Sequence, residues 1–221
     1  LKTVLDREIL SGQYDAVFPM LEPATEVLTE NVDAYKEYVK IVAAPYDSFM
    51  KAYDKQETMR ICMENGIPCP ITKLDTESLE EYLSKVSFPL ACKPRKGTGS
   101  IGFHKVDSIE ELNEMVDSGR LVVEDYVIQE YIPQTDMQYG AYLMIGLNQQ
   151  MKSALVVEKT RWYPIDGGAG SLIRTVNSDE MVDYSERLLK ALEWRGFGHL
   201  GFIMDPRYKV PKVMEINGRI P

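Results

Sequence analysis

The stretch MEINGRIP, residues 214–221, ends the chain and carries its most informative pattern. Glu215, Asn217 and Arg219 stand at alternate positions behind the apolar pair Val213–Met214. Because alternate side chains of a strand point to one face, a carboxylate, an amide and a guanidinium are expected to converge there. Such a set suits a divalent metal held by hard oxygen ligands, with an arginine for a phosphate or carboxylate. An amphipathic strand with a solvated polar face fits the same residues equally well.

The composition is that of an ordinary globular protein. The chain has 221 residues, of which 44% are hydrophobic and 27% charged, enough for one large domain or two small ones. No apolar run approaches the ~20 residues that a transmembrane helix needs. The chain starts at Leu1 rather than at Met, so we expect it to be a fragment of a longer protein.

The charge and the cysteines narrow the class of protein. A net charge of −9 argues against a general binder of nucleic acid or of a membrane surface, and a nucleotide would need local Lys, Arg or Mg²⁺. Cys62, Cys69 and Cys92 form no CxxC pair, which is typical of reduced thiols in an intracellular protein. We therefore expect a cytoplasmic location. His104 and His199 lie far apart in sequence, which disfavours a zinc site.

Apolar periodicity, caps and glycines predict an α+β protein with much antiparallel sheet. Strands are expected at 14–19, 39–43, 88–93, 103–106, 126–132, 138–147, 152–159, 171–176, 200–205 and 212–217. Helices are expected between 20 and 38, and at 54–65, 78–85, 108–119 and 177–195. A polar, Gly-rich loop is expected at 160–170.

Several of these helices carry start and stop signals. Capping pairs are predicted for Asp54 with Glu57, Ser108 with Glu111, and Asn177 with Glu180. Gly196 and Gly198 are expected to end the last helix.

The glycine-rich stretch GTGSIG, residues 97–102, lies between two expected strands. It matches G-x-G-x-x-G, but a dinucleotide fold would need a helix to open at its last glycine. A Walker A loop would end in Gly-Lys-Ser/Thr, and a protein kinase places its lysine downstream of the loop. Here Lys93 ends the preceding apolar strand, so the stretch is interpreted as a hairpin whose backbone N–H groups lie over phosphates. The alternative is a flexible surface hairpin, which leaves Lys93 unexplained.

Taken in order, six motifs resemble the ATP-grasp superfamily: DK (54–55), GIPCP (66–70), FPLACKP (88–94), GTGSIG (97–102), VIQEYIP (127–133) and MEINGR (214–219). They are most similar to its carbamoyl-phosphate synthetase large-subunit and carboxylate–amine ligase branch. The resemblance implies an ATP-grasp fold in which two α+β subdomains with antiparallel sheets sandwich ATP. Residues 1–45 would be the tail of an α/β pre-ATP-grasp domain, 46–125 a linker helix with the small subdomain and its Gly-rich loop, and 126–221 the truncated C-terminal subdomain.

The resemblance also implies roles for single residues in binding ATP. Two lysines would meet the nucleotide phosphates: Lys55 and Lys93. The loop over the triphosphate would include Gly97, Thr98, Gly99, Ser100 and Gly102. The backbone of a hinge strand would read the adenine edge at Glu130, Tyr131 and Ile132. Gln138 stands where the family usually has a ribose-binding acid.

Metal binding is implied at the end of the chain. Glu215 and Asn217 would hold Mg²⁺, or Mn²⁺ in its place, and Arg219 would contact the transferring phosphate. The family's other metal ligand falls at Gly201 in this sequence, and Asp205 is the only nearby acid. Binding of a second metal is therefore an open question.

The segment 158–174, EKTRWYPIDGGAGSLIR, is expected to face the substrate. Lys159, Arg161 and Arg174 supply cations, and an arginine can hold a carboxylate with two hydrogen bonds. The alternative is a solvated hairpin connection in which Trp162 packs as a lid.

Three hypotheses for the function follow from the resemblance. The leading one is an ATP-dependent ligase that activates a carboxylate, or a carbonate-like substrate, as an acylphosphate for attack by an amine or similar nucleophile. A phosphotransferase is the second, and a non-catalytic nucleotide-binding module, suggested by Gly201, Gln138 and Gly218, is the third. The expected partners are small-molecule carboxylate and amine substrates, with a homodimer as an option, and neither nucleic acid nor membrane.

Overall fold

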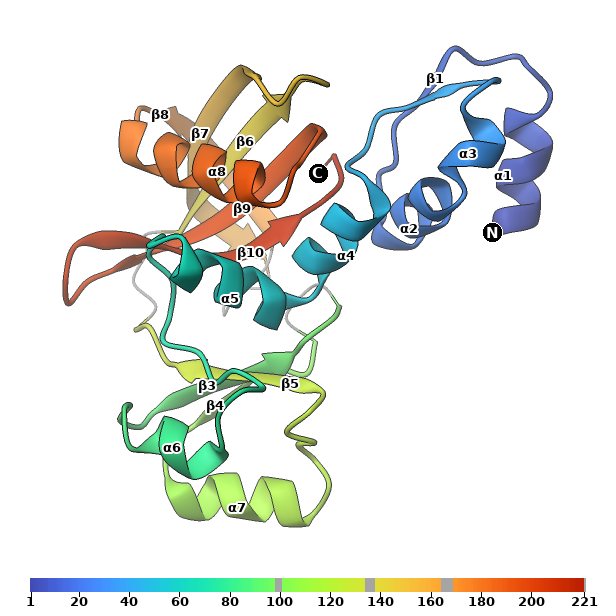
Figure 1. Cartoon of the computed structure of the whole chain (residues 1–221). Coiled ribbons are helices and arrows are strands. Elements are labelled where there is room, and N and C mark those ends of the chain that lie inside the picture. Colours follow the sequence, from blue (N-terminus) through green and yellow to red (C-terminus); the bar gives the residue numbers. More distant parts are fainter. Residues whose placement is uncertain (98–100, 134–137, 164–168, 221) are drawn as a thin grey trace.

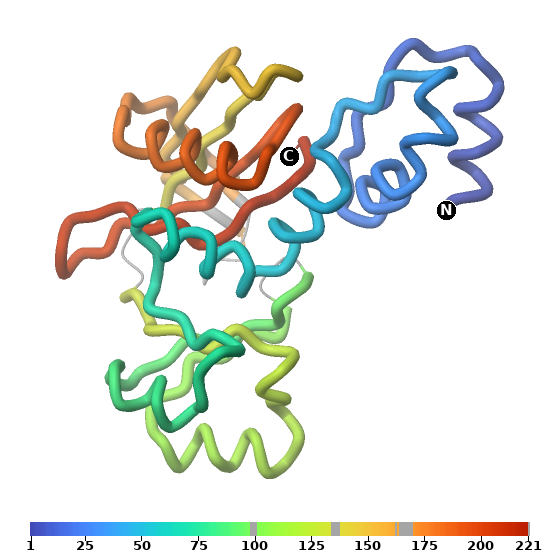
Figure 2. Tube along the Cα trace, in the orientation of Figure 1, coloured from blue at the N-terminus to red at the C-terminus, as the bar shows by residue number. Residues whose placement is uncertain are grey.

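The computed structural model describes residues 1–97, 101–133, 138–163 and 169–220. Three units are visible in Figure 1: an N-terminal unit, a small unit built on three strands, and a large sheet covered by helices. Figure 2 shows the chain running from the N-terminal unit along two helices into the small unit, and returning to build the large sheet. None of the described helices is long and apolar enough to cross a membrane.

The N-terminal unit is a small α/β structure. Its elements are α1 (Lys2–Ile9), β1 (Ala16–Val17), α2 (Glu22–Glu30), α3 (Val32–Tyr35) and β2 (Lys40–Ile41). The two strands pair in parallel and are much shorter than the predicted 14–19 and 39–43. A separate apolar core joins these elements through Ile9, Leu28, Tyr35 and Val39. Helix α1 was not among the predicted elements.

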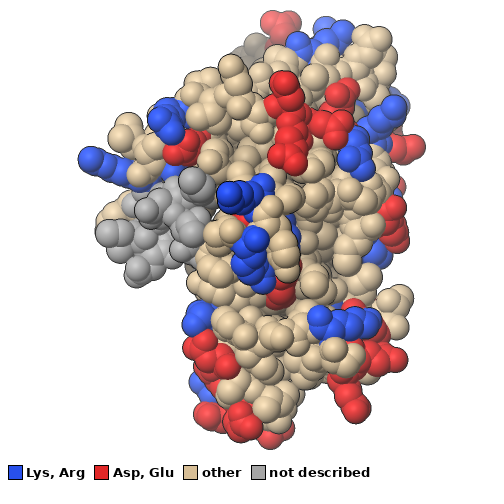
Figure 3. Space-filling view, turned by 90° about the vertical axis from the view of Figure 1, so that its left-hand side faces the viewer, with Lys and Arg blue, Asp and Glu red and all other residues tan. Residues whose placement is uncertain are grey.

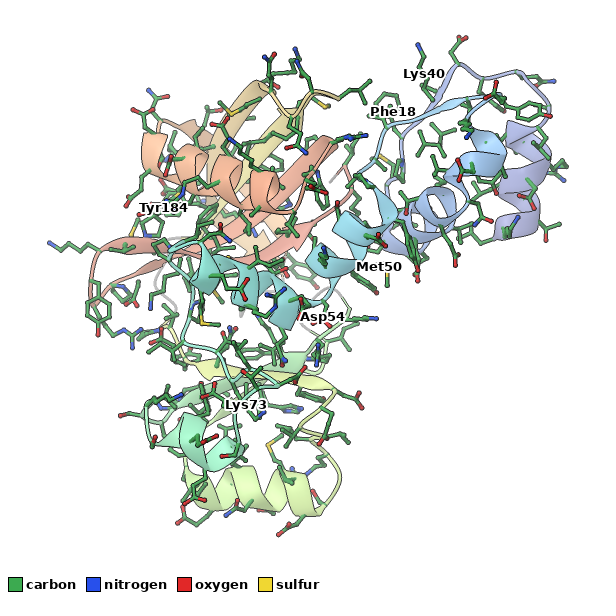
Figure 4. The ribbon with its side chains drawn as sticks, in the orientation of Figure 1. Phe18, Lys40, Met50, Asp54, Lys73 and Tyr184 are labelled. Atoms are coloured by element: carbon green, nitrogen blue, oxygen red, sulfur yellow. The ribbon has the colours of Figure 1, made fainter. Side chains whose placement is uncertain are left out.

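Two helices lead from this unit towards the rest of the chain: α4 (Tyr46–Tyr53) and α5 (Lys55–Glu64). Asp54 separates them, and its carboxylate accepts from the Gln56 N–H at 3.0 Å, so it caps α5 as predicted. Figure 4 shows Asp54 at this junction, near the small unit. The predicted capping partner Glu57 pairs with Arg60 instead.

The small unit contains a sheet of order β4-β3-β5, with antiparallel pairing throughout. Its elements are α6 (Leu79–Leu83), β3 (Leu90–Pro94), β4 (His104–Val106), α7 (Ile109–Asp117) and β5 (Tyr126–Glu130). Tyr82, Leu90, Leu112 and Ile128 are among the residues of its apolar core. The Gly-rich stretch connects β3 to β4, as the sequence predicts, although residues 98–100 lie outside the described chain.

The large sheet has the order β10-β9-β6-β7-β8, and every neighbouring pair is antiparallel. Its strands are β6 (Gln138–Ile145), β7 (Met151–Tyr163), β8 (Ala169–Val176), β9 (Gly196–Asp205) and β10 (Val210–Asn217). One face carries apolar residues such as Ala141, Leu200 and Phe202, which share a core with α4, α5 and α8 (Asp179–Ala191). The α+β class with antiparallel sheets is confirmed.

Several local predictions for this part of the chain are wrong. Ser178, not Asn177, caps α8, because its hydroxyl accepts from the Met181 N–H. Gly196 and Gly198 do not end α8; they lie in β9. The predicted loop at 160–170 is largely strand, since β7 continues to Tyr163 and β8 begins at Ala169, while 164–168 lie outside the described residues.

The apolar cores show to which unit the residues near the predicted domain boundaries belong. Phe49, Met59 and Cys62, from the two linking helices, belong to the core of the large sheet rather than to that of the small unit. Ile128, placed by the sequence in the C-terminal subdomain, belongs to the core of the small unit. The boundaries at 45 and 125 remain predictions.

Candidate functional site

A bulge in β10 decides where the motif residues point. Val213 pairs with Phe202, and the next paired residue, Glu215, stands opposite Gly201, so Met214 is the extra residue. Val213 therefore faces the apolar core with Phe202, whereas Glu215 faces the opposite, polar side of the sheet. Gly201 leaves room there, because a Cβ on it would lie 3.3 Å from Cγ of Glu215.

Three side chains meet on this polar face. Asn217 Nδ2 lies 3.3 Å from Oε1 of Glu215 and 3.4 Å from Nδ1 of His199, the residue opposite Asn217 on β9. His199 is 9% exposed, and its ring stacks on Tyr142 with centroids 4.4 Å apart. Burial lowers the pKa of His199 to about 4, although Glu215 acts in the opposite direction. The imidazole is therefore neutral at pH 7.

Two lysines stand beside Glu215. Lys93 Nζ donates to the Met214 carbonyl at the bulge at 3.2 Å, and Lys55 Nζ donates to the Gly97 carbonyl at 2.7 Å. Burial lowers the pKa of Lys93 to about 8 and also lowers that of Lys55, while Glu215 opposes both shifts. Burial alone would raise the pKa of Glu215, but Lys93 and then Lys55 hold it below its ordinary value.

Lys55, Glu215 and Asn217 border a small recess between separate segments of the chain. Its walls include Tyr53 of α4, Lys55 at the start of α5, Gly97 in the Gly-rich connection, and Glu215 and Asn217 of β10. A carboxylate, an amide and a nearby lysine are thereby presented together. In the face drawn in Figure 3, Lys and Arg side chains gather at mid-height, whereas Asp and Glu dominate the lower end, over the small unit.

Arg219 does not continue the alternation of Glu215 and Asn217. Strand β10 ends at Asn217, and Arg219 Nε pairs with Oε1 of Glu22 on α2 at 2.6 Å. Glu22 also lines the recess, so Arg219 stays close to it but is held by the N-terminal unit.

Asp205 is separated from Glu215 and Asn217. It stands opposite Val210 at the far end of the strand pair, where it is fully buried. Arg207 lies 2.6 Å and Lys212 3.0 Å from its carboxylate. The expected third oxygen ligand therefore belongs to a different cluster, because the position opposite Glu215 on β9 is Gly201.

The predicted hinge residues lie where β5 leaves the small unit. The Glu130 N–H donates to the Ile71 carbonyl, and the Glu130 carboxylate pairs with Lys212 at 2.6 Å. Tyr131 N–H donates to the Pro89 carbonyl at 3.3 Å, and Ile132 is buried. Gln138 begins β6 opposite Lys159. Of the predicted phosphate loop, Gly97 and Gly102 have positive φ, and Thr98, Gly99 and Ser100 lie outside the described residues.

The cations of the 158–174 segment are divided between the two faces of the sheet. Lys159 stands opposite Gln138 on β6. Gln138 is two positions from Gly140, so both point to the same face, and Gly140 stands opposite Gly201. Lys159 therefore shares the polar face with Glu215. Arg174 stands opposite Glu158 on the other face and pairs with it at 2.8 Å. Arg161 is exposed between two irregularities of the β7–β8 register. Arg174 therefore lies on the face opposite Lys159, and the binding of a substrate carboxylate by Arg161 or Arg174 stays a prediction.

The sequence did not predict that His199 lies beside Asn217 and Glu215. The only signal that could have found it is its spacing of two residues from Gly201, which places both on one face of a strand.

Comparison with known proteins agrees with this architecture. A family model described as ATP-grasp domain matches residues 52–221. A D-alanine–D-alanine ligase of Francisella tularensis subsp. novicida is 28% identical over 183 residues, 81% of this chain and 61% of that protein. The carbamoyl phosphate synthase large chain of Thermoanaerobacter sp. is 25% identical over 204 residues, 87% of this chain and 18% of that protein. The chain thus spans less than two thirds of the length of these relatives.

Solved structures show the same fold. Biotin carboxylase from Campylobacter jejuni, in complex with β-γ-ATP, superposes with a TM-score of 0.73 at 14% identity, over 100% of this chain and 52% of that one. D-alanine–D-alanine ligase from Bacillus anthracis complexed with ATP gives 0.69 at 16% identity, over 99% of this chain and 72% of that one.

Proposed function

The chain belongs to the ATP-grasp family, and from that premise we propose that it acts as an ATP-dependent ligase, which activates a small carboxylic acid as an acylphosphate. The observation that carries this proposal is a recess bordered by Lys55, Glu215 and Asn217, with Lys93 held beside Glu215 by its hydrogen bond to the Met214 carbonyl. Two ammonium groups suit a polyphosphate, and two potential oxygen ligands suit the cation that accompanies it.

The lysines would bind the phosphates because they are only partly compensated by protein. Each donates to a backbone carbonyl, and each is close enough to Glu215 for its pKa to be raised by that carboxylate. Glu215 is the one carboxylate that acts on both lysines. Asp54 and Glu22 also act on Lys55, but they are paired with Arg95 and Arg219. A phosphate oxygen would complete the pairing, and charge-assisted hydrogen bonds of this kind are the strong ones.

Glu215 and Asn217 fit a divalent cation. The Asn217 Nδ2 donates to Oε1 of Glu215 at 3.3 Å. With the amide rotated by 180°, Oδ1 would take the place of Nδ2, at close to the separation of about 3.0 Å between neighbouring ligands at roughly 2.1 Å from an octahedral Mg²⁺. Mg²⁺ usually keeps several waters and takes phosphate oxygens, so two protein ligands are compatible with binding together with the nucleotide. When bound, the cation would neutralise charge on the phosphates.

The chemistry needs no protein nucleophile. A substrate carboxylate oxygen would attack the γ-phosphorus, the bond to the bridging oxygen would break, and ADP would leave. An amine nitrogen would then attack the acyl carbon, phosphate would leave, and the amine proton would pass to solvent. The protein would contribute positioning and charge neutralisation, with Lys93 and Lys55 on the phosphates and Arg219, released from Glu22, on the transferring group.

Lys159 is the best candidate to bind the acid, because it shares the polar face with Glu215. Arg161 is a second candidate on the same strand. Among the relatives are ligases whose names specify amino acids, so amino acids are the first class of acid to test. A cytoplasmic location and a homodimer remain predictions.

Hydroxylamine trapping tests the proposal. The chain would be incubated with Mg·ATP, hydroxylamine and a panel of amino acids and other small carboxylic acids, and ADP and hydroxamate would both be measured. A ligase forms one hydroxamate per ADP with its true acid, and Lys93→Met removes both signals. ADP formed with a stable phosphorylated product and no hydroxamate would favour a phosphotransferase. ATP binding without ADP formation for any acid would favour a binding module.

A further inference from the structure

The burial of the His199 imidazole has a free-energy cost that its packing does not explain. Its Nε2 atom is buried and has no hydrogen-bond partner among the described residues. A buried polar atom without a partner destabilises a fold, and an apolar side chain could stack on Tyr142 without that cost. Such local costs are typical of functional positions.

The other ring nitrogen faces the proposed cation site. Nδ1 lies 3.4 Å from the Asn217 amide, which in turn lies 3.3 Å from Glu215 Oε1. The amide thus stands between the imidazole and the carboxylate, with both spacings close to the roughly 3.0 Å expected between neighbouring ligands of a six-coordinate metal. Rotating the amide by 180° would turn its Oδ1 towards both neighbours.

The strands hold this geometry firmly. His199 and Asn217 are direct partners in the β9–β10 ladder, and Glu215 is opposite Gly201, two residues from His199. On the far side, a Cβ on Gly140 would lie 2.9 Å from Nε2. The imidazole is therefore enclosed between Tyr142 and the backbone at Gly140, and its Nδ1 edge is the one turned to Asn217, which lines the recess.

We propose that His199 is a third protein ligand, through Nδ1, of the divalent cation held by Glu215 and Asn217. This inference rests on the proposed function, which requires that cation. One nitrogen and two oxygen ligands make the site less suited to Mg²⁺, which prefers oxygen, and better suited to Mn²⁺ and later transition metals.

The test uses Mn²⁺ with a non-hydrolysable ATP analogue and electron spin-echo envelope modulation, which detects a coordinated imidazole nitrogen. The chain has two histidines, so His104→Gln is a matched control. The nitrogen signal is expected in the wild type and in His104→Gln and is lost in His199→Gln. His199→Asn, with an oxygen near the place of Nδ1, should keep Mn²⁺ binding but lack the imidazole signal.

Affinities provide a second readout that needs no turnover. Calorimetry should show Mn²⁺ binding weakened at least about tenfold in His199→Gln, the lower end of the loss seen even for residues that only support a metal ligand. The preference for Mn²⁺ over Mg²⁺ should fall in the same variant. Urea unfolding would establish that each variant is folded.

The outcomes separate the two proposals. Mn²⁺ that binds, is lost in Glu215→Gln, and shows no imidazole nitrogen in the wild type would overturn the role of His199 and leave the ligase proposal standing. No Mn²⁺ or Mg²⁺ binding in the presence of the nucleotide analogue would overturn both.

Discussion

Lys93 keeps a charge where water is largely excluded. Its only hydrogen bond among the described residues is to the Met214 carbonyl, and burial lowers its pKa to about 8. At pH 7 most of the population is still protonated. An ammonium with one neutral acceptor has two further donors to offer, and a phosphate oxygen is the partner that the proposed function supplies.

We expect Lys93→Met to weaken Mg·ATP binding at least tenfold, because a hydrogen bond to a charged group contributes about 1.5–3 kcal/mol. Isothermal titration calorimetry measures the effect. Lys85→Met is the control, since Lys85 is exposed in the small unit and pairs with Glu77. Unchanged affinity for Mg·ATP in a folded Lys93→Met protein would mean that Lys93 does not bind the phosphates.

At the scale of elements, small shifts of backbone geometry decide which side chains can act together. The bulge at Met214 turns Glu215 away from the core that its neighbour Val213 enters. Lys159 and Glu158 are neighbours in β7 and therefore point to opposite faces of the sheet. Arg174 pairs with Glu158, so it lies on the face opposite Lys159. Helix α8 starts one residue later than predicted because Ser178, not Asn177, caps it.

The cap of α8 provides a stability test with a built-in control. Ser178→Ala should lower the free energy of unfolding by about 1 kcal/mol, because the Met181 N–H loses its side-chain acceptor. Asn177→Ala should change it by much less. Urea denaturation of both variants measures the difference. An equal loss of stability in the two variants would contradict the assignment of the cap to Ser178.

The two faces of β7 provide a kinetic test, once trapping identifies the acid. Lys159→Ala should raise KM for the acid several-fold, while Arg174→Ala should leave it near the wild-type value, because Arg174 is two-thirds exposed beside Glu158. Initial rates at varied acid and saturating ATP measure both. A larger effect of Arg174→Ala would mean that the β7–β8 hairpin rearranges when substrate binds.

At the scale of the whole molecule, an ionic cluster ties the small unit to the large sheet. It consists of Glu130 from β5, Asp205 from β9, Arg207 in the following turn and Lys212 from β10. The cluster lies at the end of the predicted hinge strand, so it is placed to hold the relative orientation of the two units. Breaking such a buried pair leaves an uncompensated charge, which is strongly destabilising.

This cluster predicts acid sensitivity. Hydrogen bonds from Arg207 hold the pKa of Asp205 well below its usual range, against the effect of burial and with help from Lys212. Burial would raise the pKa of Glu130, but Lys212, the Ile71 N–H and Arg207 lower it. Because both folded pKa values are depressed, their stabilisation is complete above the ordinary carboxyl values of about 4 and is lost as pH falls through the folded values.

The free energy of unfolding should therefore decrease steadily below about pH 5. Asp205→Asn should be less stable at pH 7 and should show a shallower decrease on acidification, because one of the two titrating carboxylates is gone. Urea denaturation between pH 7 and pH 3 measures both slopes. Parallel slopes in the two proteins would place the acid-sensitive groups elsewhere.

The sequence alone determined the family, the α+β class and the features that depend on neighbouring residues. Asp54 and Ser108 cap helices as predicted, and the glycine stretch joins two antiparallel strands. Such signals can be read from sequence because a cap or a turn is a hydrogen bond between residues a few positions apart. The order of six motifs was enough to identify the ATP-grasp fold.

Only the tertiary structure decided which distant side chains meet. Arg219 pairs with Glu22, which is 197 residues away in sequence, and Lys93 donates to the Met214 carbonyl, which is 121 residues away. The bulge that turns Glu215, and the strand register that brings His199 to Asn217, depend on which strands become neighbours. Because a shift of one residue sends a side chain to the other face of a sheet, alternation within β10 was insufficient to place the site.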